Sequence, residues 1–140
     1  MRRLLSMFDL EKMRDMAVAK TFSSGEVIIE EGATLPYSMY IILKGKVGIY
    51  KEYRSPLAAL LNTLGAGDFF GETSLLLLQP RTATCVAMEA NTTVFEVSQM
   101  NVYELIEKHP EILFTISKAL CERVSELDNK LAMRLRRFSK

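Results

Sequence analysis

The sequence predicts a mainly β fold with flanking helices, in which antiparallel strands form a barrel or roll. Between residues 20 and 98, short runs of β-favouring residues alternate with turn residues, and no segment there is long enough for a crossover helix. Apolar residues at helical spacing are confined to the two ends of the chain. With 140 residues, 49% of them hydrophobic and 25% charged, we expect a single domain with one core.

Composition narrows the classes of function. No apolar run approaches the roughly 18 residues of a membrane helix, and charged residues follow the N-terminus too soon for a signal peptide. We therefore expect a cytoplasmic protein without membrane insertion. The formal net charge of +1 argues against extensive nucleic-acid binding. Residues 131–140 are locally basic, which fits a solvated helix end whose dipole favours cations as well as it fits a DNA or membrane patch.

Cysteine and histidine usage argues against metal and enzyme sites. Cys85 and Cys121 are far apart, so neither a disulfide framework nor a zinc or iron–sulfur site is indicated, and we expect both side chains to be buried. The single histidine, His109, precedes Pro110, a position more typical of a structural or solvent-facing residue than of a haem ligand. Because no catalytic triad, Cys/His pair or metal-ligand set can be assembled around one histidine, no enzyme is predicted.

The expected elements of the first hundred residues follow in chain order. Residues 1–19 carry apolar side chains at helical spacing, which predicts a short amphipathic helix. Strands are expected at residues 27–29, 40–43, 47–50, 59–64, 82–88 and 92–97. Gly45 lies between the second and third of these runs, which predicts a β-hairpin whose turn uses the positive φ that glycine allows.

Two helices are expected after Val97, at residues 100–109 and from Pro110 toward Arg137. They should meet at an angle, because Pro110 favours a first helical turn and biases the preceding residue out of a helix. Spacings of four and three in the second helix form an apolar stripe typical of a coiled-coil seam, made of Leu120, Val124, Leu127 and Leu131. About two heptads are too few to be stable alone, so the stripe should lie against a second copy of the chain, against the β-rich part, or against both.

The stretch from Gly67 to Thr84 has the features of an anion site. A strand is expected to end at Phe70, Gly71 lets the backbone turn, and a helix begins at Glu72. Unpaired N–H groups and the dipole at a helix start both favour an anion. Arg81 then returns on the next strand, and a guanidinium fork suits a phosphate.

Glu72 would repel a phosphate, so its presence needs another explanation. Acidic residues accept hydrogen bonds from ribose hydroxyls in dinucleotide sites, and Glu72 is expected to do the same here. Thr82 adds a hydroxyl for the phosphate or the base. A phosphate and a ribose together predict a nucleotide ligand.

These residues carry a resemblance to a known family. The runs Phe70-Gly71-Glu72 and Pro80-Arg81-Thr82-Ala83-Thr84, at their spacing, resemble the phosphate-binding cassette of the cyclic-nucleotide-binding family. That family includes the catabolite activator protein and other CRP-FNR-type regulators, the regulatory subunit of cAMP-dependent protein kinase, and cyclic-nucleotide-gated channels. Residues 22–32 resemble its opening strands and residues 40–47 its central hairpin, so nearly the whole chain is covered.

The resemblance implies a layout of one domain over residues 1–140. An antiparallel β-roll (a double-stranded β-helix, jelly-roll-like) is expected over residues 20–98, with the cassette at 70–84. A helix is expected at 1–19, and lid or dimerisation helices at 99–140. The residues that the resemblance assigns are Glu72 for the ribose 2′-hydroxyl; Gly71, Thr73, Ser74, Arg81 and Thr82 for the cyclic phosphate; and Leu64, Phe70 and Arg123 for the base. Thr73 and Ser74 depart from the aliphatic and small residues common there.

We therefore expect a regulatory module that binds cAMP, requires no other cofactor and signals through its C-terminal helices. cGMP is the alternative ligand, because Thr82 resembles a residue that helps accept guanine in some channel members. Two further hypotheses stay open. In the first, the chain is the ligand-binding part of a CRP-FNR-type transcription regulator without its helix-turn-helix. In the second, it is a degenerate module that dimerises without nucleotide. Sequence-specific DNA binding by this chain alone is not expected.

The sequence also leads to an expectation about the exposure of Arg81. A cassette arginine is expected to be exposed when no ligand is bound. Arg81→Ala should then abolish nucleotide binding and leave the fold intact.

Overall fold

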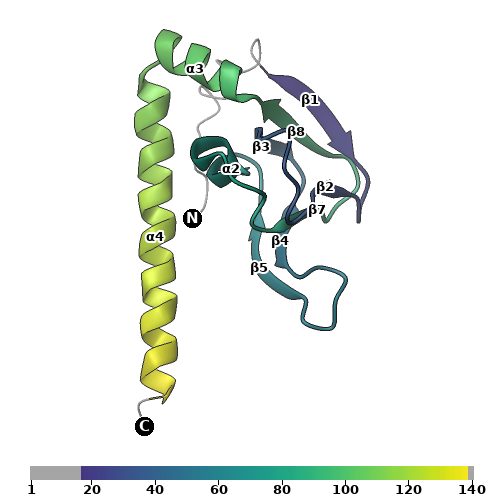
Figure 1. The fold of residues 1–140 in the computed structure, drawn as a ribbon, viewed down its shortest axis with the longest axis vertical. Coiled ribbons are helices and arrows are strands. Elements are labelled where there is room, and N and C mark those ends of the chain that lie inside the picture. The colour runs from purple at the N-terminus through teal and green to yellow at the C-terminus, as the bar shows by residue number, and fades with distance from the viewer. Residues whose placement is uncertain (1–16, 139–140) are drawn as a thin grey trace.

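The computed structural model describes residues 17–138 and contains two antiparallel sheets of four strands each (Figure 1). The strand order is β1-β8-β3-β6 in sheet A and β2-β7-β4-β5 in sheet B. The strands are β1 Val18–Phe22, β2 Val27–Ile29, β3 Met39–Lys44, β4 Val47–Lys51, β5 Ala59–Leu64, β6 Phe69–Phe70, β7 Thr84–Ala87 and β8 Thr92–Val97. The helices are α2 Glu72–Leu77, α3 Gln99–Lys108 and α4 Glu111–Phe138. The predicted fold, an antiparallel β-roll followed by two helices, is confirmed.

Sheet A separates two apolar cores, because successive side chains of a strand point to opposite faces. The core shared with sheet B contains Ile29, Tyr40, Ile42, Val47, Leu64, Phe70, Cys85 and Val94. The core on the other face, which includes residues of α3 and α4, contains Met39, Ile41, Phe69, Leu75, Phe95, Val97, Val102, Leu105, Ile112, Ile116 and Ala119. Strand β6 contributes Phe69 to one core and Phe70 to the other, so the start of the cassette is anchored on both faces of the sheet.

The two C-terminal helices differ in how they pack. The Ser98 hydroxyl caps α3, and α4 begins directly after Pro110, where the sequence predicted the junction. The first half of α4 buries Ile112, Ile116 and Ala119 against sheet A and α3. Its second half runs as a straight helix beside β5 and ends beyond the strands (Figure 1). Within residues 17–138, no helix is both long enough and apolar enough to cross a bilayer.

The predicted hairpin over residues 40–50 is wrong. Strand β3 pairs with β6 and β8, whereas β4 pairs with β5 and β7, so the chain passes from sheet A to sheet B at Gly45. Gly45 has a φ of 92°, so the turn needs glycine as expected. The turn signal was correct, but it carries no information on which sheet the next strand joins.

The structure also differs from the sequence at the N-terminal helix, at the strand expected over residues 82–88 and at one of the two cysteines. The N-terminal helix falls almost wholly outside the described residues, and Val18 and Ala19 open strand β1 instead of ending a helix. The strand expected at 82–88 is limited to Thr84–Ala87. Cys85 is buried, and its burial raises the pKa of the thiol to about 12, but Cys121 is exposed on α4 rather than buried.

The crossing at Gly45 yields a prediction about stability. A Cβ at Gly45 would meet the Thr92 Oγ1 atom at 2.4 Å and its Cα at 2.8 Å, and the positive φ adds backbone strain. We expect Gly45→Ala to lower the free energy of unfolding by about 2 kcal/mol or more. Gly65→Ala is the matched control, because a Cβ there meets nothing within 4 Å and no positive φ is involved. Urea unfolding measures both, and equal stabilities of the two variants would contradict this account.

Candidate functional site

A pocket of about 220 Å³ opens between sheet B, α2 and α4. All of the site residues predicted from the sequence line it: Leu64, Phe70, Gly71, Glu72, Thr73, Ser74, Arg81, Thr82 and Arg123. Sequence reasoning missed the remaining lining residues, Ile29, Ile49, Asn62 and Ala83. Ile49 and Asn62 are cross-strand partners in β4 and β5, so the pairing of these two strands would have been needed to find them.

The turn between β6 and α2 forms one wall of the pocket. Gly71 caps α2 with a φ of 81° and a ψ of 3°, a left-handed conformation that favours glycine. A Cβ at this position would lie 3.1 Å from both the Arg81 Nη1 atom and the Ser38 carbonyl oxygen. Gly71 therefore provides the turn and also lets Arg81 approach the backbone. The first N–H groups of α2 have no acceptor within the helix, as the sequence predicted.

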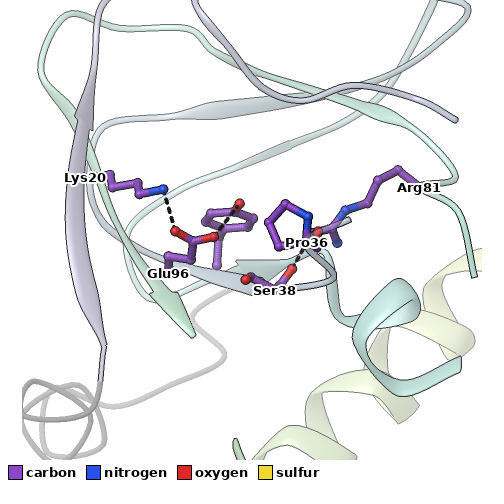
Figure 2. Close-up of polar contacts among 6 residues, drawn as sticks. Lys20, Pro36, Ser38, Arg81 and Glu96 are labelled. Atoms are coloured by element: carbon purple, nitrogen blue, oxygen red, sulfur yellow. Dashed lines mark hydrogen bonds and ion pairs between the residues drawn. The ribbon is translucent and has the colours of Figure 1, made fainter. Parts of the chain in front are cut away.

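Arg81 is the best-anchored polar residue of the pocket, and its environment corrects the sequence-based expectation. It is 5% exposed, not solvated. Its Nη1 donates to the Gly71 carbonyl oxygen at 3.0 Å, and its Nη2 donates to the carbonyl oxygens of Pro36 at 2.8 Å and Ser38 at 2.7 Å. Figure 2 shows the guanidinium reaching the segment that carries Pro36 and Ser38.

No carboxylate among residues 17–138 forms an ion pair with Arg81; its hydrogen bonds all go to backbone carbonyls. Burial lowers the pKa of Arg81, although a guanidinium remains protonated at any ordinary pH. The pocket is therefore bordered by a buried cation whose charge is not neutralised by a paired anion. Such a cation favours an anionic ligand, because no carboxylate in the described part of the chain is paired with it.

Glu72 and Arg123 form an ion pair between the cassette and α4. Arg123 also donates a hydrogen bond to the Phe69 carbonyl oxygen, and its guanidinium carbon stands 4.3 Å from the centre of the Phe69 ring. Both charged side chains are largely buried, with 12% of Glu72 and 20% of Arg123 exposed. Arg123 therefore brings the C-terminal helix into direct contact with the pocket.

The other predicted residues divide into a floor and a rim. Leu64 and Phe70 are buried, and the Phe70 ring stacks on Tyr40 with centroids 5.2 Å apart. Thr73 is half-buried and Ser74 is buried in the first turn of α2. Thr82 is exposed at the rim, where its carbonyl accepts a hydrogen bond from Lys51. The pocket thus joins an apolar floor to a polar wall of opposite charges.

His109 lies away from this pocket. It is partly exposed, and its Nδ1 is 3.7 Å from the Glu111 carboxylate. Among residues 17–138 no group of three or more His, Cys, Asp or Glu side chains could hold a metal ion.

The fold is an antiparallel roll followed by two helices, and its pocket is lined by a buried guanidinium and a carboxylate. Residues 19–109 match the family described as the cyclic nucleotide-binding domain, and the chain belongs to that family. A relative, the cyclic AMP receptor protein of Thermus thermophilus, is 29% identical over 112 residues, which cover 80% of this chain and 51% of the relative.

A further relative and a solved structure support this assignment. The cGMP-dependent protein kinase of Toxoplasma gondii is 36% identical over 110 residues, or 79% of this chain and 10% of the kinase. The crystal structure of the Thermus thermophilus catabolite activator protein matches with a TM-score of 0.79 at 25% identity, covering 92% of this chain and 60% of that one. The chain therefore spans about half of the bacterial receptor protein and a small part of the kinase.

The anchoring of Arg81 predicts that this residue stabilises the fold. Arg81→Ala removes a charged donor from three carbonyls, so we expect the free energy of unfolding to fall by about 2–4 kcal/mol. Arg54→Ala is the control, because the Arg54 side chain is 63% exposed and its contacts with Glu30 and the Tyr53 ring lie at the surface; it should cost less than about 1 kcal/mol. Thermal and urea unfolding measure both. An Arg81→Ala protein as stable as the Arg54→Ala protein would restore the original expectation.

Proposed function

We propose that this chain is a regulatory module that binds a cyclic nucleotide, with cAMP as the preferred ligand, and that Arg81 and the start of α2 hold its cyclic phosphate. The observation that carries the proposal is the buried Arg81 guanidinium, which borders the pocket and has no carboxylate partner among residues 17–138. A guanidinium has five N–H donors, and three of them are bound to carbonyls here. Two remain for the phosphate oxygens.

The ribose is assigned to Glu72. A carboxylate accepts about four hydrogen bonds, so the Glu72 side chain has room for a ribose hydroxyl beside Arg123. The apolar side chains of Leu64, Ile49 and Phe70 then offer a surface for the base. In this arrangement the phosphate meets the cation and the ribose meets the carboxylate, which avoids placing two anions in contact.

The signalling step follows from the position of Arg123 on α4. A ribose hydroxyl at Glu72 changes the hydrogen bonds of Arg123, and Arg123 belongs to the helix that a partner would contact. Ligand binding then shifts the population between two packings of α4, to the extent that it binds one packing more tightly. The choice of cAMP rests on likeness to the bacterial receptor protein, and the likeness to a cGMP-dependent kinase keeps cGMP as the alternative.

Calorimetric titration with cAMP and cGMP tests the binding proposal. The parent, prepared free of nucleotide, should give saturable binding with cAMP as the tighter ligand. Glu72→Gln removes a charged acceptor and should weaken binding by about tenfold or more. Glu104→Gln, an exposed carboxylate on α3, is the matched control and should bind like the parent. No heat with either nucleotide would favour the alternative, a module that dimerises without a ligand.

We further propose that the chain forms a homodimer through α4. Val124, Leu127 and Leu131 are each more than half exposed, whereas Leu120 packs on the core. Leu127 and Leu131 border an open apolar groove of about 660 Å³, and β5 forms its other side. The roll therefore leaves most of the predicted stripe uncovered, and a second copy of α4 would bury it.

Sedimentation velocity tests the homodimer. Leu127→Glu places a charge in the stripe and should shift a dimeric parent to the monomer, because a buried unpaired carboxylate is costly. Asn129→Glu adds the same charge on the opposite side of α4 and should leave the dimer intact. A parent that sediments as a monomer at every concentration would contradict the proposal.

A further inference from the structure

A cross-strand row of sheet A leads from β8 to the cassette. In the pairing of β8 with β3, Glu96 lies opposite Tyr40, and in the pairing of β3 with β6, Tyr40 lies opposite Phe70. Directly opposite residues have their side chains on the same face, so the three form one row. The Tyr40 and Phe70 rings stack with an interplanar angle of 15°. Phe70 is followed by Gly71, so the row ends at the turn of the anion site.

The Glu96 carboxylate contacts Tyr40 of the row and Lys20 of the neighbouring strand. Its Oε2 accepts a hydrogen bond from the Tyr40 hydroxyl at 3.2 Å, and its Oε1 pairs with Lys20 of β1 (Figure 2). Only 16% of the Glu96 side chain is exposed. Burial alone would raise the pKa of Glu96, but hydrogen bonds from Lys20, Ser38 and Tyr40 lower it overall. The carboxylate is therefore ionised at neutral pH.

Two routes connect Glu96 to the guanidinium of Arg81. Through the first, the Ser38 side chain helps to lower the pKa of Glu96, and the Ser38 carbonyl oxygen accepts a hydrogen bond from Arg81 at 2.7 Å. Through the second, Tyr40 stacks on Phe70, and the next residue, Gly71, accepts from Arg81 with its carbonyl oxygen. Of the three carbonyls that hold the guanidinium, one belongs to Ser38, and a second belongs to Gly71, which directly follows the Phe70 ring stacked on Tyr40.

We propose that Glu96 is a positioning residue of the anion site: through Ser38 and Tyr40 it fixes the carbonyls that orient Arg81 toward the pocket. This inference rests on the proposed function for its effect on ligand affinity, although its effect on Arg81 exists without a ligand. Glu96 lines no part of the pocket. It acts on the site from β8, which lies between β1 and β3 in sheet A, and so links the edge strand β1 to the cassette.

The inference is tested by two measurements on the full chain. Nitrogen NMR of the Arg81 side chain, assigned by its loss in Arg81→Lys, reports how fast its N–H protons exchange with water in the nucleotide-free protein. Calorimetry with cAMP reports affinity. Glu96→Gln should speed the exchange by about tenfold and weaken cAMP binding by about tenfold, because an ionised acceptor of several hydrogen bonds is lost.

Two other variants make the test specific. Glu89→Gln is the matched control, because Glu89 is an exposed carboxylate that also pairs with a lysine, Lys46 at 3.8 Å. It should change neither measurement. Tyr40→Phe keeps the ring stack and removes only the hydroxyl, so it should give a smaller change in the same direction as Glu96→Gln, and it decides the matter if Glu96→Gln does not fold.

The outcomes separate this inference from the proposed function. Unchanged exchange in Glu96→Gln overturns the inference, as does an equal change in Glu89→Gln. Faster exchange with unchanged affinity, in a parent that binds cAMP, also overturns it. A parent that binds neither cAMP nor cGMP overturns the proposed function instead, and the exchange rate of Arg81 alone then decides whether Glu96 positions this side chain.

Discussion

The buried guanidinium of Arg81 is the interaction on which the arrangement of the pocket depends. Its three carbonyl partners come from the turn at Gly71 and from the segment of Pro36 and Ser38, so one side chain holds two loops and its own loop together. Carbonyl oxygens satisfy hydrogen bonds without neutralising the charge, which leaves the cation available to an anion. Arg81 therefore fixes the turn that precedes α2 relative to the segment of Pro36 and Ser38.

The predictable part of the site is the part that is local in sequence. Gly71, Glu72 and Arg81 lie within a short stretch, and the strand, turn and helix around them follow from residue types alone. The burial of Arg81 was missed because Pro36 and Ser38 are 45 and 43 positions away, and no local pattern reveals such partners. Glu96 escaped notice for the same reason, since Tyr40 is 56 positions from it.

The error at Gly45 has a related cause. A glycine between two apolar runs predicts a tight turn, and the turn exists, but sheet membership is decided by packing against strands that are distant in sequence. In contrast, the stripe on α4 follows from helical periodicity and is present where expected. Periodicity indicates which side chains share a face, and it leaves open what covers that face. The structure narrows the choice of partner, because the roll buries only the first part of α4 and leaves an open groove between β5 and the second part.

The central claim is that Arg81 makes the pocket a site for a phosphate attached to a nucleoside. Thermal unfolding of the nucleotide-free protein in the presence of cAMP or of adenosine, which lacks the phosphate, tests it most directly. A ligand that binds only the folded state raises the melting temperature progressively with its concentration. The account predicts such a rise with cAMP and no rise with adenosine at the same concentrations. Equal rises with both compounds, or no rise with cAMP, would contradict it.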